Sequence, residues 1–554
     1  MHDRFRSQIA RLKTAAPLQP RFGAAAIESS SIWVGRRVVG TPWQNTAIQI
    51  LPALILLLFL PPAFAATDTP VEAAQTQIER LISASPHLRR GHIGFEFADA
   101  DTGELLAAQG ADQFFTPASN TKLYTTSLAL ERLGVNYQFK TSVRTTAKVT
   151  PGETDIPDVT LIGGGDPNLS GRILPFSQNA HDNDPLAAID KLADQIAQWG
   201  IRRITGDVIG DDTRYPYDPY PDGWTFDDAL WYYGAPVSAL SVNDSAVRLT
   251  VQGTETGDLA DVCLQPNVGY FVVLNQVVTD NSAESHVTIS RPTGSNELVL
   301  SGTIGRSASK IQEDVAVADP ALFAAEALKQ ALEERGIVVN GEARALHRDL
   351  NNVADPLDAP LLASLPSGTE LASLESAPLW QIVQVVNKVS QNLHAEMLLR
   401  EVGYATRNVG TLAAGLDERQ KFLQQAGITN DGYDFGDGSG LARQGVTTPA
   451  STVTLLRYMW TRPEKKLWLD SLPVGGIDGS LRRRFKGLMG GERVHAKTGS
   501  LSHVSALSGY LLTTSGRWIV FSMMANAEVG DTPEVTAFFD RACEIFVQQP
   551  AARK

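Results

Sequence analysis

The sequence predicts an α+β protein in which one helix-and-sheet domain is split along the chain by a large β-rich insertion. Strand and helix patterns occupy residues 66–145 and return in residues 370–554. Between them, residues 146–369 are rich in Gly, Asp, Pro and short β-branched runs, as expected of strands separated by turns. With 554 residues, the chain is also too long for one hydrophobic core. We therefore expect a discontinuous domain and an inserted region made of two subdomains.

The first segment of the split domain predicts a hairpin followed by a helix. Residues 92–109 alternate between apolar and polar side chains around a central Asp-Thr-Gly turn. Apolar residues then recur at helical spacing from 123 to 133, and Gly134 supplies a stop. Ser119 is therefore expected at a helix N-terminus, with Lys122 one turn further on.

The rest of the chain contributes one helix to the insertion and a mixture of helices and strands to the second segment. Residues 320–336 predict the single clear helix of the insertion. The second segment predicts helical stretches at 378–403, 411–427 and 450–460, two strands at 505–514 and 517–526, and a last helix at 532–548. No internal repeat is evident.

Composition and charge exclude several classes of function. The formal net charge of −13 argues against a general nucleic-acid binder, which needs a basic face for the phosphates. The basic run at 482–486 is expected to be a solvated surface. Only nine histidines are present and none lies in an H-E-x-x-H pattern, so neither a metal site nor another cofactor is expected.

The N-terminus carries a predicted leader over residues 1–65. An almost purely apolar run at 47–60 is followed by two prolines and Ala63-Phe64-Ala65, which predicts a secretory signal peptide cut after Ala65. A membrane anchor would need about 20 apolar residues, and the run at 47–60 is shorter and is interrupted by prolines. The mature chain is thus expected to be exported to the periplasm or cell-wall space, without an integral membrane segment. The true start site and the export route stay open.

The two cysteines, Cys263 and Cys543, are too few for a disulfide scaffold. We expect two buried free thiols. Because 280 residues separate the two cysteines, the sequence leaves open whether they pair.

Ser119 and Lys122 form an S-x-x-K pair that suits nucleophilic catalysis. A serine hydroxyl needs an adjacent base, and helix residues three apart share a face. The lysine must be neutral, which requires a desolvated site or nearby positive charge to lower its pKa. Backbone N–H groups at the helix N-terminus could stabilise an oxyanion. A second S-x-x-K, from Ser307 to Lys310, lies in a polar stretch and is interpreted as a chance match.

Two further motifs make the S-x-x-K pair specific to one class of enzyme. Lys497-Thr498-Gly499 lies just before the first of the two tail strands and is expected on a strand. Ser390 and Asn392 form an S-x-N in the C-terminal part of the 378–403 helical stretch; this tripeptide recurs elsewhere and is uninformative alone. The three motifs in this order are the signature of penicillin-binding proteins and serine β-lactamases.

The chain resembles the D-alanyl-D-alanine carboxypeptidase/endopeptidase family, the class C low-molecular-mass penicillin-binding proteins. The resemblance extends over the exported chain and includes the segments at 163–170, 206–212, 231–244 and 437–443. The family also separates its first two motifs by a large insertion, and here Ser119 and Ser390 are 271 residues apart. The resemblance implies a transpeptidase-like α+β domain with an antiparallel sheet and helices on its faces.

The resemblance implies catalytic roles for three residues. Ser119 would attack the D-Ala-D-Ala carbonyl and form an acyl-enzyme, while Lys122 takes its proton. Ser390 would relay a proton to the leaving amine. Asn392 would bind the acyl side chain of the substrate.

The same resemblance implies substrate binding by the strand that carries Lys497. Lys497 would supply positive charge, and Thr498 would bind the terminal carboxylate. Backbone N–H groups of Ser119 and Ser500 would form the oxyanion hole. Gly499 would leave room for substrate lying along the strand.

A second tier of candidate residues lies outside the three motifs. Trp224, Asp227 and Tyr232 resemble the stretch that reaches the cleft from the insertion, where Asp227 could meet a cationic amine. The alternative is a turn with aromatic anchors. Asp437 and Ser439 would shape the cleft, although a tight glycine turn explains them equally well.

The implied activity is a serine DD-peptidase that hydrolyses D-Ala-D-Ala ends or D-Ala cross-links of peptidoglycan stem peptides. Penicillins and other β-lactam antibiotics would be covalent inhibitors. The alternatives are a serine β-lactamase and a non-catalytic penicillin-binding wall protein; the 271-residue gap is too long for a compact lactamase. The balance of carboxypeptidase and endopeptidase activity, the stem-peptide chemistry and the oligomeric state stay open.

Overall fold

The central sheet joins the two ends of the chain. In this computed structural model, which describes residues 70–150, 152–178, 183–350, 368–527 and 532–548, the sheet has the order β19-β20-β21-β1-β2 and every pair is antiparallel. Its strands are β1 (His92–Asp99), β2 (Leu105–Gln109), β19 (Val494–Leu501), β20 (Val504–Leu512) and β21 (Trp518–Asn526). The predicted hairpin and split domain are confirmed, and the tail holds a third strand, β19, which carries the K-T-G. The predicted leader lies outside the described residues.

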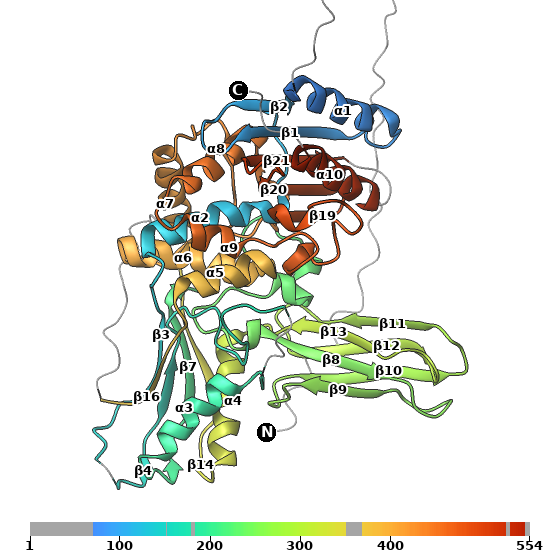
Figure 1. Cartoon of the computed structure of the whole chain (residues 1–554). Helices are drawn as coiled ribbons and strands as arrows, with labels where there is room; N and C mark the ends of the chain where they lie inside the picture. The colour runs from blue at the N-terminus through green and yellow to red at the C-terminus, as the bar shows by residue number, and fades with distance from the viewer. Residues whose placement is uncertain (1–69, 151, 179–182, 351–367, 528–531, 549–554) are drawn as a thin grey trace, which may run out of the picture. The chain divides into compact units, whose positions relative to one another are not determined.

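Alternating side chains let this sheet support a core on each face. On one face, side chains such as Phe97 and Phe521 pack with α1 (Pro70–Ala84) and α10 (Thr532–Val547). On the other, Tyr510 and Val520 join a core formed with the remaining helices of the domain. These are α2 (Thr121–Leu133), α5 (Leu379–Lys388), α6 (Asn392–Arg407), α7 (Leu412–Gln425), α8 (Pro449–Trp460) and α9 (Lys465–Ser471) (Figure 1).

The chain enters and leaves the insertion through two paired strands. β3 (Lys140–Thr145) and β16 (Thr369–Glu375) are antiparallel neighbours at one edge of a sheet of order β15-β7-β5-β3-β16. We propose the boundaries of the insertion at this strand pair. The other strands of the sheet are β5 (Val159–Ile162), β7 (Val208–Pro216) and β15 (Ala343–Arg348).

Further strands of the insertion form smaller sheets. One three-stranded sheet contains β13-β8-β9, another β10-β12-β11, and a third pairs short strands in the order β14-β6-β4. Their bounds are β4 (Asp155–Ile156), β6 (Arg203–Ile204), β8 (Ala246–Gln252), β9 (Asp261–Gln265), β10 (Val272–Asp280), β11 (Ser285–Ser290), β12 (Glu297–Gly305), β13 (Ile311–Ala316) and β14 (Val338–Val339).

The insertion contains a helix that the sequence analysis missed. The predicted helix at 320–336 is confirmed as α4 (Pro320–Glu334), but α3 (Ala187–Ala197) also forms. Ile189, Leu192 and Ile196 of α3 are fully buried at helical spacing. This periodicity was readable, and its Gly- and Asp-rich surroundings obscured it.

The stretch predicted as one helix at 378–403 is two helices, so that prediction is wrong at its centre. α5 ends at Lys388 and α6 begins at Asn392. Ser390, between them, has a left-handed φ of 68°. The side chain of Gln391 accepts a hydrogen bond from the Leu393 N–H and caps the second helix. No glycine or proline marks the break, and the apolar period continues through it.

Both cysteines are free, but only one is buried. Cys543 is fully buried on α10, as expected. Cys263 is exposed on β9, so the expectation of two buried thiols is wrong for this residue. The side chains of β9 alternate between exposed and half-buried positions, and Cys263 takes one of the exposed positions.

Phe97 tests how firmly the two ends of the chain are joined. Its ring stacks on Phe521 of β21 at 5.4 Å and on Phe546 of α10 at 4.2 Å between centroids. Phe97→Ala is expected to lower the free energy of unfolding by about 3–5 kcal/mol. Urea unfolding measures the change. Phe114→Ala, at a side chain 49% exposed, is the matched control and should change stability by less than about 0.5 kcal/mol.

Candidate active site

Ser119 and Lys122 meet at the start of α2. Ser119 lies in a 3-10 turn (Ala118–Asn120) that leads directly into the helix, and Lys122 is fully buried in its first turn. The Lys122 Nζ lies 2.9 Å from the Ser119 Oγ. It also lies 2.6 Å from Asn392 Oδ1 and 2.7 Å from the carbonyl oxygen of Ser439. One amine therefore contacts groups from three separate segments of the chain.

Burial gives the Lys122 amine the protonation state that a base needs. It lowers the pKa of Lys122 to about 7, although the negative charges of Asp437 and Glu396 act in the opposite direction. Near neutral pH a large fraction of this amine is thus unprotonated. It can accept a proton from the hydroxyl that it contacts.

Lys497 connects the K-T-G strand to the break between α5 and α6. Its Nζ lies 2.8 Å from the Ser390 Oγ and 2.8 Å from the carbonyl oxygen of Thr498. Burial, and then the charge of Lys122, lower the pKa of Lys497 well below its usual value. A carboxylate bound beside it would raise that pKa again, since an opposite charge favours the ammonium form.

Asn392 is held between α2 and the insertion. Its side-chain oxygen accepts from Lys122, and its Nδ2 donates to the carbonyl oxygen of Tyr233 at 2.7 Å. Tyr233 lies in a short 3-10 helix (Tyr232–Gly234) of the insertion. The structure thus brings five of the predicted residues into one cluster made of two hydrogen-bonded groups, Ser119–Lys122–Asn392 and Lys497–Ser390.

The other predicted strand residues follow Lys497 along β19. The Thr498 hydroxyl lies 2.7 Å from the hydroxyl of Ser480, and Ser500 is exposed. Gly499 is buried, and a Cβ on it would lie 2.4 Å from the carbonyl oxygen of Pro117. Close packing against the turn that carries Ser119 therefore excludes a side chain here, a reason that the sequence analysis did not give.

The second-tier candidates divide into two groups. The Trp224 Nε1 donates to the carboxylate of buried Asp437, and Asp437 in turn accepts from the N–H groups of the glycine-rich turn that contains Ser439. Asp227 is exposed and Tyr232 is 45% exposed. Within the described part of the chain, neither of these two side chains is hydrogen-bonded to the five-residue cluster.

Glu396 is a buried acid that the sequence analysis missed. It is fully buried on α6, one turn after Asn392, and its Oε1 accepts from the N–H groups of Gly438 and Ser439. Burial, with the charge of Asp437 second, raises the pKa of Glu396 to about 7. Its neighbours one turn away in either direction, Asn392 and Arg400, are polar as well, so the sequence carries no signal that this acid is buried.

Asp244 was also missed, although it ends a segment that carries the family resemblance. Its carboxylate accepts from Gln391 Nε2 at 2.8 Å and lies 2.8 Å from His394 Nε2. It also forms a bidentate ion pair with Arg172. Burial opposes its ionisation, but Arg172 and His394 hold the pKa of Asp244 well below its usual range. Through Gln391, the insertion thereby supports the turn that contains Ser390.

The second S-x-x-K match has a different environment. Ser307 and Lys310 are both exposed, between β12 and β13. The pattern there lacks the burial that lowers the pKa of Lys122.

Among the described residues, no group of three or more His, Cys, Asp or Glu side chains is placed to hold a metal ion.

Comparison with known families decides what this arrangement is. A model described as the D-Ala-D-Ala carboxypeptidase 3 (S13) family matches residues 74–542. The chain belongs to this family. The predicted membership is therefore confirmed.

Two relatives with a named activity support the assignment to the D-Ala-D-Ala carboxypeptidase 3 family. The D-alanyl-D-alanine carboxypeptidase of Actinomadura sp. (strain R39) is 33% identical over 506 residues, which is 88% of each chain. The D-alanyl-D-alanine carboxypeptidase DacB of Haemophilus influenzae is 24% identical over 459 residues, 80% of this chain and 88% of that protein.

The crystal structure of penicillin binding protein 4 (dacB) from Haemophilus influenzae has a similar fold. It superposes with a TM-score of 0.70 at 22% identity, covering 84% of this chain and 98% of that one. A second structure of that protein, complexed with a β-lactam, gives a TM-score of 0.64. The penicillin-binding fold that the sequence predicted is confirmed.

Gly499→Ala tests the close approach of β19 to the Ser119 turn. The added methyl group must displace the backbone at Pro117, so we expect stability to fall by about 1–3 kcal/mol and acylation by penicillin to slow. Thermal unfolding and the rate of penicillin labelling measure both effects. Gly91→Ala is the matched control, since its Cβ would meet only ordinary contacts at 3.6 Å and beyond. Unchanged labelling in Gly499→Ala would contradict the packing argument.

The pKa of Lys122 predicts a pH dependence. A base is active when unprotonated, so the acylation rate should fall about tenfold per pH unit below about 7 and level off above it. Stopped-flow measurement with a chromogenic β-lactam across pH 5–9 is the test.

Glu396→Gln separates the two groups that have a pKa near 7. Removing the charge of Glu396 removes an influence that raises the pKa of Lys122. The midpoint of the acylation profile should therefore move to lower pH and keep its shape. A profile that becomes flat in this variant would assign the titration to Glu396 in place of Lys122.

Proposed function

We propose that this member of the D-Ala-D-Ala carboxypeptidase 3 family cleaves the D-Ala-D-Ala end of peptidoglycan stem peptides through an acyl-enzyme on Ser119. The observation that carries the proposal is the 2.9 Å contact between the Ser119 hydroxyl and a buried amine whose pKa is lowered to about 7. A nucleophile within reach of a neutral base is the arrangement that acyl transfer needs.

In the proposed acylation, the Ser119 Oγ attacks the carbonyl carbon of the penultimate D-Ala, and its proton passes to the Lys122 Nζ. N–H groups of Ser119 and Ser500 stabilise the oxyanion. The C–N bond then breaks, and the leaving amine of the terminal D-Ala takes a proton through the Ser390 hydroxyl. The Ser390 oxygen in turn takes the proton that Lys122 received from Ser119, so Lys122 is neutral again before deacylation.

Deacylation uses the same groups in reverse. A water molecule gives a proton to Lys122 and attacks the ester carbonyl. The C–O bond to Ser119 then breaks, Lys122 returns the proton to the Ser119 oxygen, and a shortened peptide with a new carboxylate is released. Lys497 and Thr498 bind the terminal carboxylate of the substrate, and Asn392 orients the acyl portion. The same chemistry opens cross-links that follow a D-Ala, but the named relatives favour carboxypeptidase activity for this chain.

The proposed substrate places the protein outside the cytoplasm, in the periplasm or cell-wall space. The leader expected at 1–65 would direct this export. Among the helices that the structure describes, none has the length and apolar character needed to cross a membrane. We propose β-lactam antibiotics as covalent ligands of Ser119, since a related protein of this fold has been crystallised with one.

Labelling with a fluorescent penicillin tests the nucleophile. Wild-type protein should gain one stable adduct by gel and intact mass. Ser119→Ala should lose the adduct and at least about a thousandfold in the rate of D-Ala release from a pentapeptide. Ser307→Ala is the matched control, because it removes the serine of the exposed S-x-x-K and should label as wild type does.

The possible outcomes separate the competing functions. Labelling that survives in Ser119→Ala would identify another nucleophile. A folded wild-type protein that never labels would be a non-catalytic relative. An adduct that hydrolyses within seconds would indicate a serine β-lactamase.

A further inference from the structure

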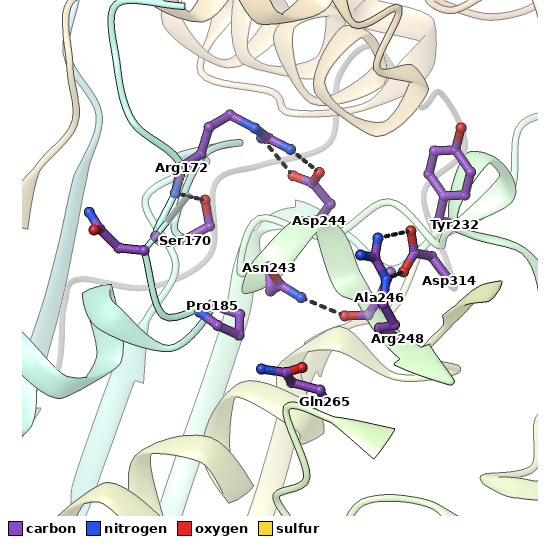
Figure 2. Close-up of a pocket in the computed structure, with 12 residues that line it drawn as sticks. Ser170, Arg172, Pro185, Tyr232, Asn243, Asp244, Ala246, Arg248, Gln265 and Asp314 are labelled. Atoms are coloured by element: carbon purple, nitrogen blue, oxygen red, sulfur yellow. Dashed lines mark hydrogen bonds and ion pairs between the residues drawn. The ribbon is translucent and has the colours of Figure 1, made fainter. Parts of the chain in front are cut away.

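A polar pocket of about 290 Å³ opens in the insertion (Figure 2). Its wall includes two arginine–aspartate pairs, Arg172 with Asp244 and Arg248 with Asp314, together with Tyr232 and Gln265. The proposed catalytic roles do not use this pocket. Its volume is near the lower end of the range for small-molecule sites, about 300 Å³, and suits a single ring-sized group.

The charges of the wall cancel in pairs. The Arg172 guanidinium binds both carboxylate oxygens of Asp244. Arg248 lies directly opposite Asp314 on neighbouring strands and donates to both of its oxygens at 2.8 Å. A charged ligand would meet a carboxylate beside every guanidinium. The pocket therefore favours an uncharged ligand with many hydroxyl or amide groups.

Tyr232 and Gln265 present contacts that suit such a ligand. The Tyr232 ring is 45% exposed and offers an apolar face beside polar side chains. Burial, and then the charges of Asp314 and Asp244, raise the pKa of the Tyr232 hydroxyl, which remains a donor at neutral pH. Gln265 is exposed at the end of β9 and can both donate and accept.

The pocket wall contacts the S-x-N turn directly through Asp244 and adjoins it through the neighbour of Tyr232. Asp244 accepts a hydrogen bond from Gln391, the residue between Ser390 and Asn392. Tyr232 is adjacent to Tyr233, whose carbonyl oxygen holds the Asn392 side chain. A ligand group in the pocket therefore lies next to the turn that is proposed to contact the acyl portion of the substrate.

We propose that this pocket binds an N-acetylated amino sugar of the glycan to which the stem peptides are attached. The inference rests on the proposed function for its choice of substrate, and on the pocket for its chemistry. A sugar ring can stack its C–H face on Tyr232, while its hydroxyl and N-acetyl groups bond to Gln265 and to the outer atoms of the ion pairs. The insertion thus recognises glycan while the split domain cleaves peptide.

Paired substrates test the proposal. D-Ala release is measured for a disaccharide-pentapeptide and for the same pentapeptide without sugar, using wild type, Gln265→Ala and Arg248→Ala. Wild type should prefer the sugar-bearing substrate by about tenfold, mainly through a lower KM, as one or two added hydrogen bonds predict. Each pocket variant should lose most of this preference and keep the wild-type rate of penicillin labelling.

Arg306→Ala is the matched control for the arginine variant. Arg306 has the same side-chain exposure as Arg248, 54%, and also pairs with an acid, Glu255, but it does not line the pocket. It should keep the preference. Equal cleavage of the two substrates by wild type, or a preference that survives both pocket variants, would overturn the proposal.

A direct binding measurement distinguishes failure of the proposed sugar site from failure of the proposed peptidase function. Calorimetry with the uncharged disaccharide of two N-acetylglucosamine units needs no catalysis. Saccharide binding that Gln265→Ala weakens would support the pocket even if Ser119 were never labelled. Penicillin labelling without any saccharide binding would leave the peptidase and reject the sugar site.

Discussion

The burial of one amine is the constraint on which the rest of the site depends. A lysine without solvent can remain in a protein interior only if it is largely neutral or tightly hydrogen-bonded. The Lys122 Nζ meets this requirement with oxygens of Ser119, Asn392 and Ser439, which come from three distant segments. Each segment must therefore be placed correctly before the amine is satisfied. The same burial that destabilises the charged form of the amine lowers its pKa and makes it a base.

Chain topology supplies that placement. The first hairpin pairs with the last strands, so β19 and the turn before α2 meet although Ser119 and Lys497 are 378 residues apart. The insertion leaves and returns through the β3–β16 pair, which brings its ends together and limits the entropic cost of its length. It then contributes Tyr233, Asp244 and Trp224 to the surroundings of the cluster.

The sequence predicted most helices and strands and the ordered motifs, because these depend on local periodicity and on residue type. Apart from α3, whose period was readable, it failed where tertiary contacts decide. Ser390 adopts a left-handed conformation within an unbroken apolar period, and contacts of Gln391 with Asp244 support that turn. Glu396 looks like an ordinary helix residue until the 437–440 turn is placed over it.

The two buried lysines together suggest how substrate could organise the proposed reaction. Both have lowered pKa values, and the charge of Lys122 is one cause of the shift at Lys497. The two amines therefore compete for ionisation. A substrate carboxylate beside Lys497 would stabilise the ammonium form there, and that new positive charge would disfavour protonation of Lys122. Binding of a peptide with a free carboxylate would thus increase the fraction of neutral base next to Ser119, which links recognition of the chain end to activation of the nucleophile.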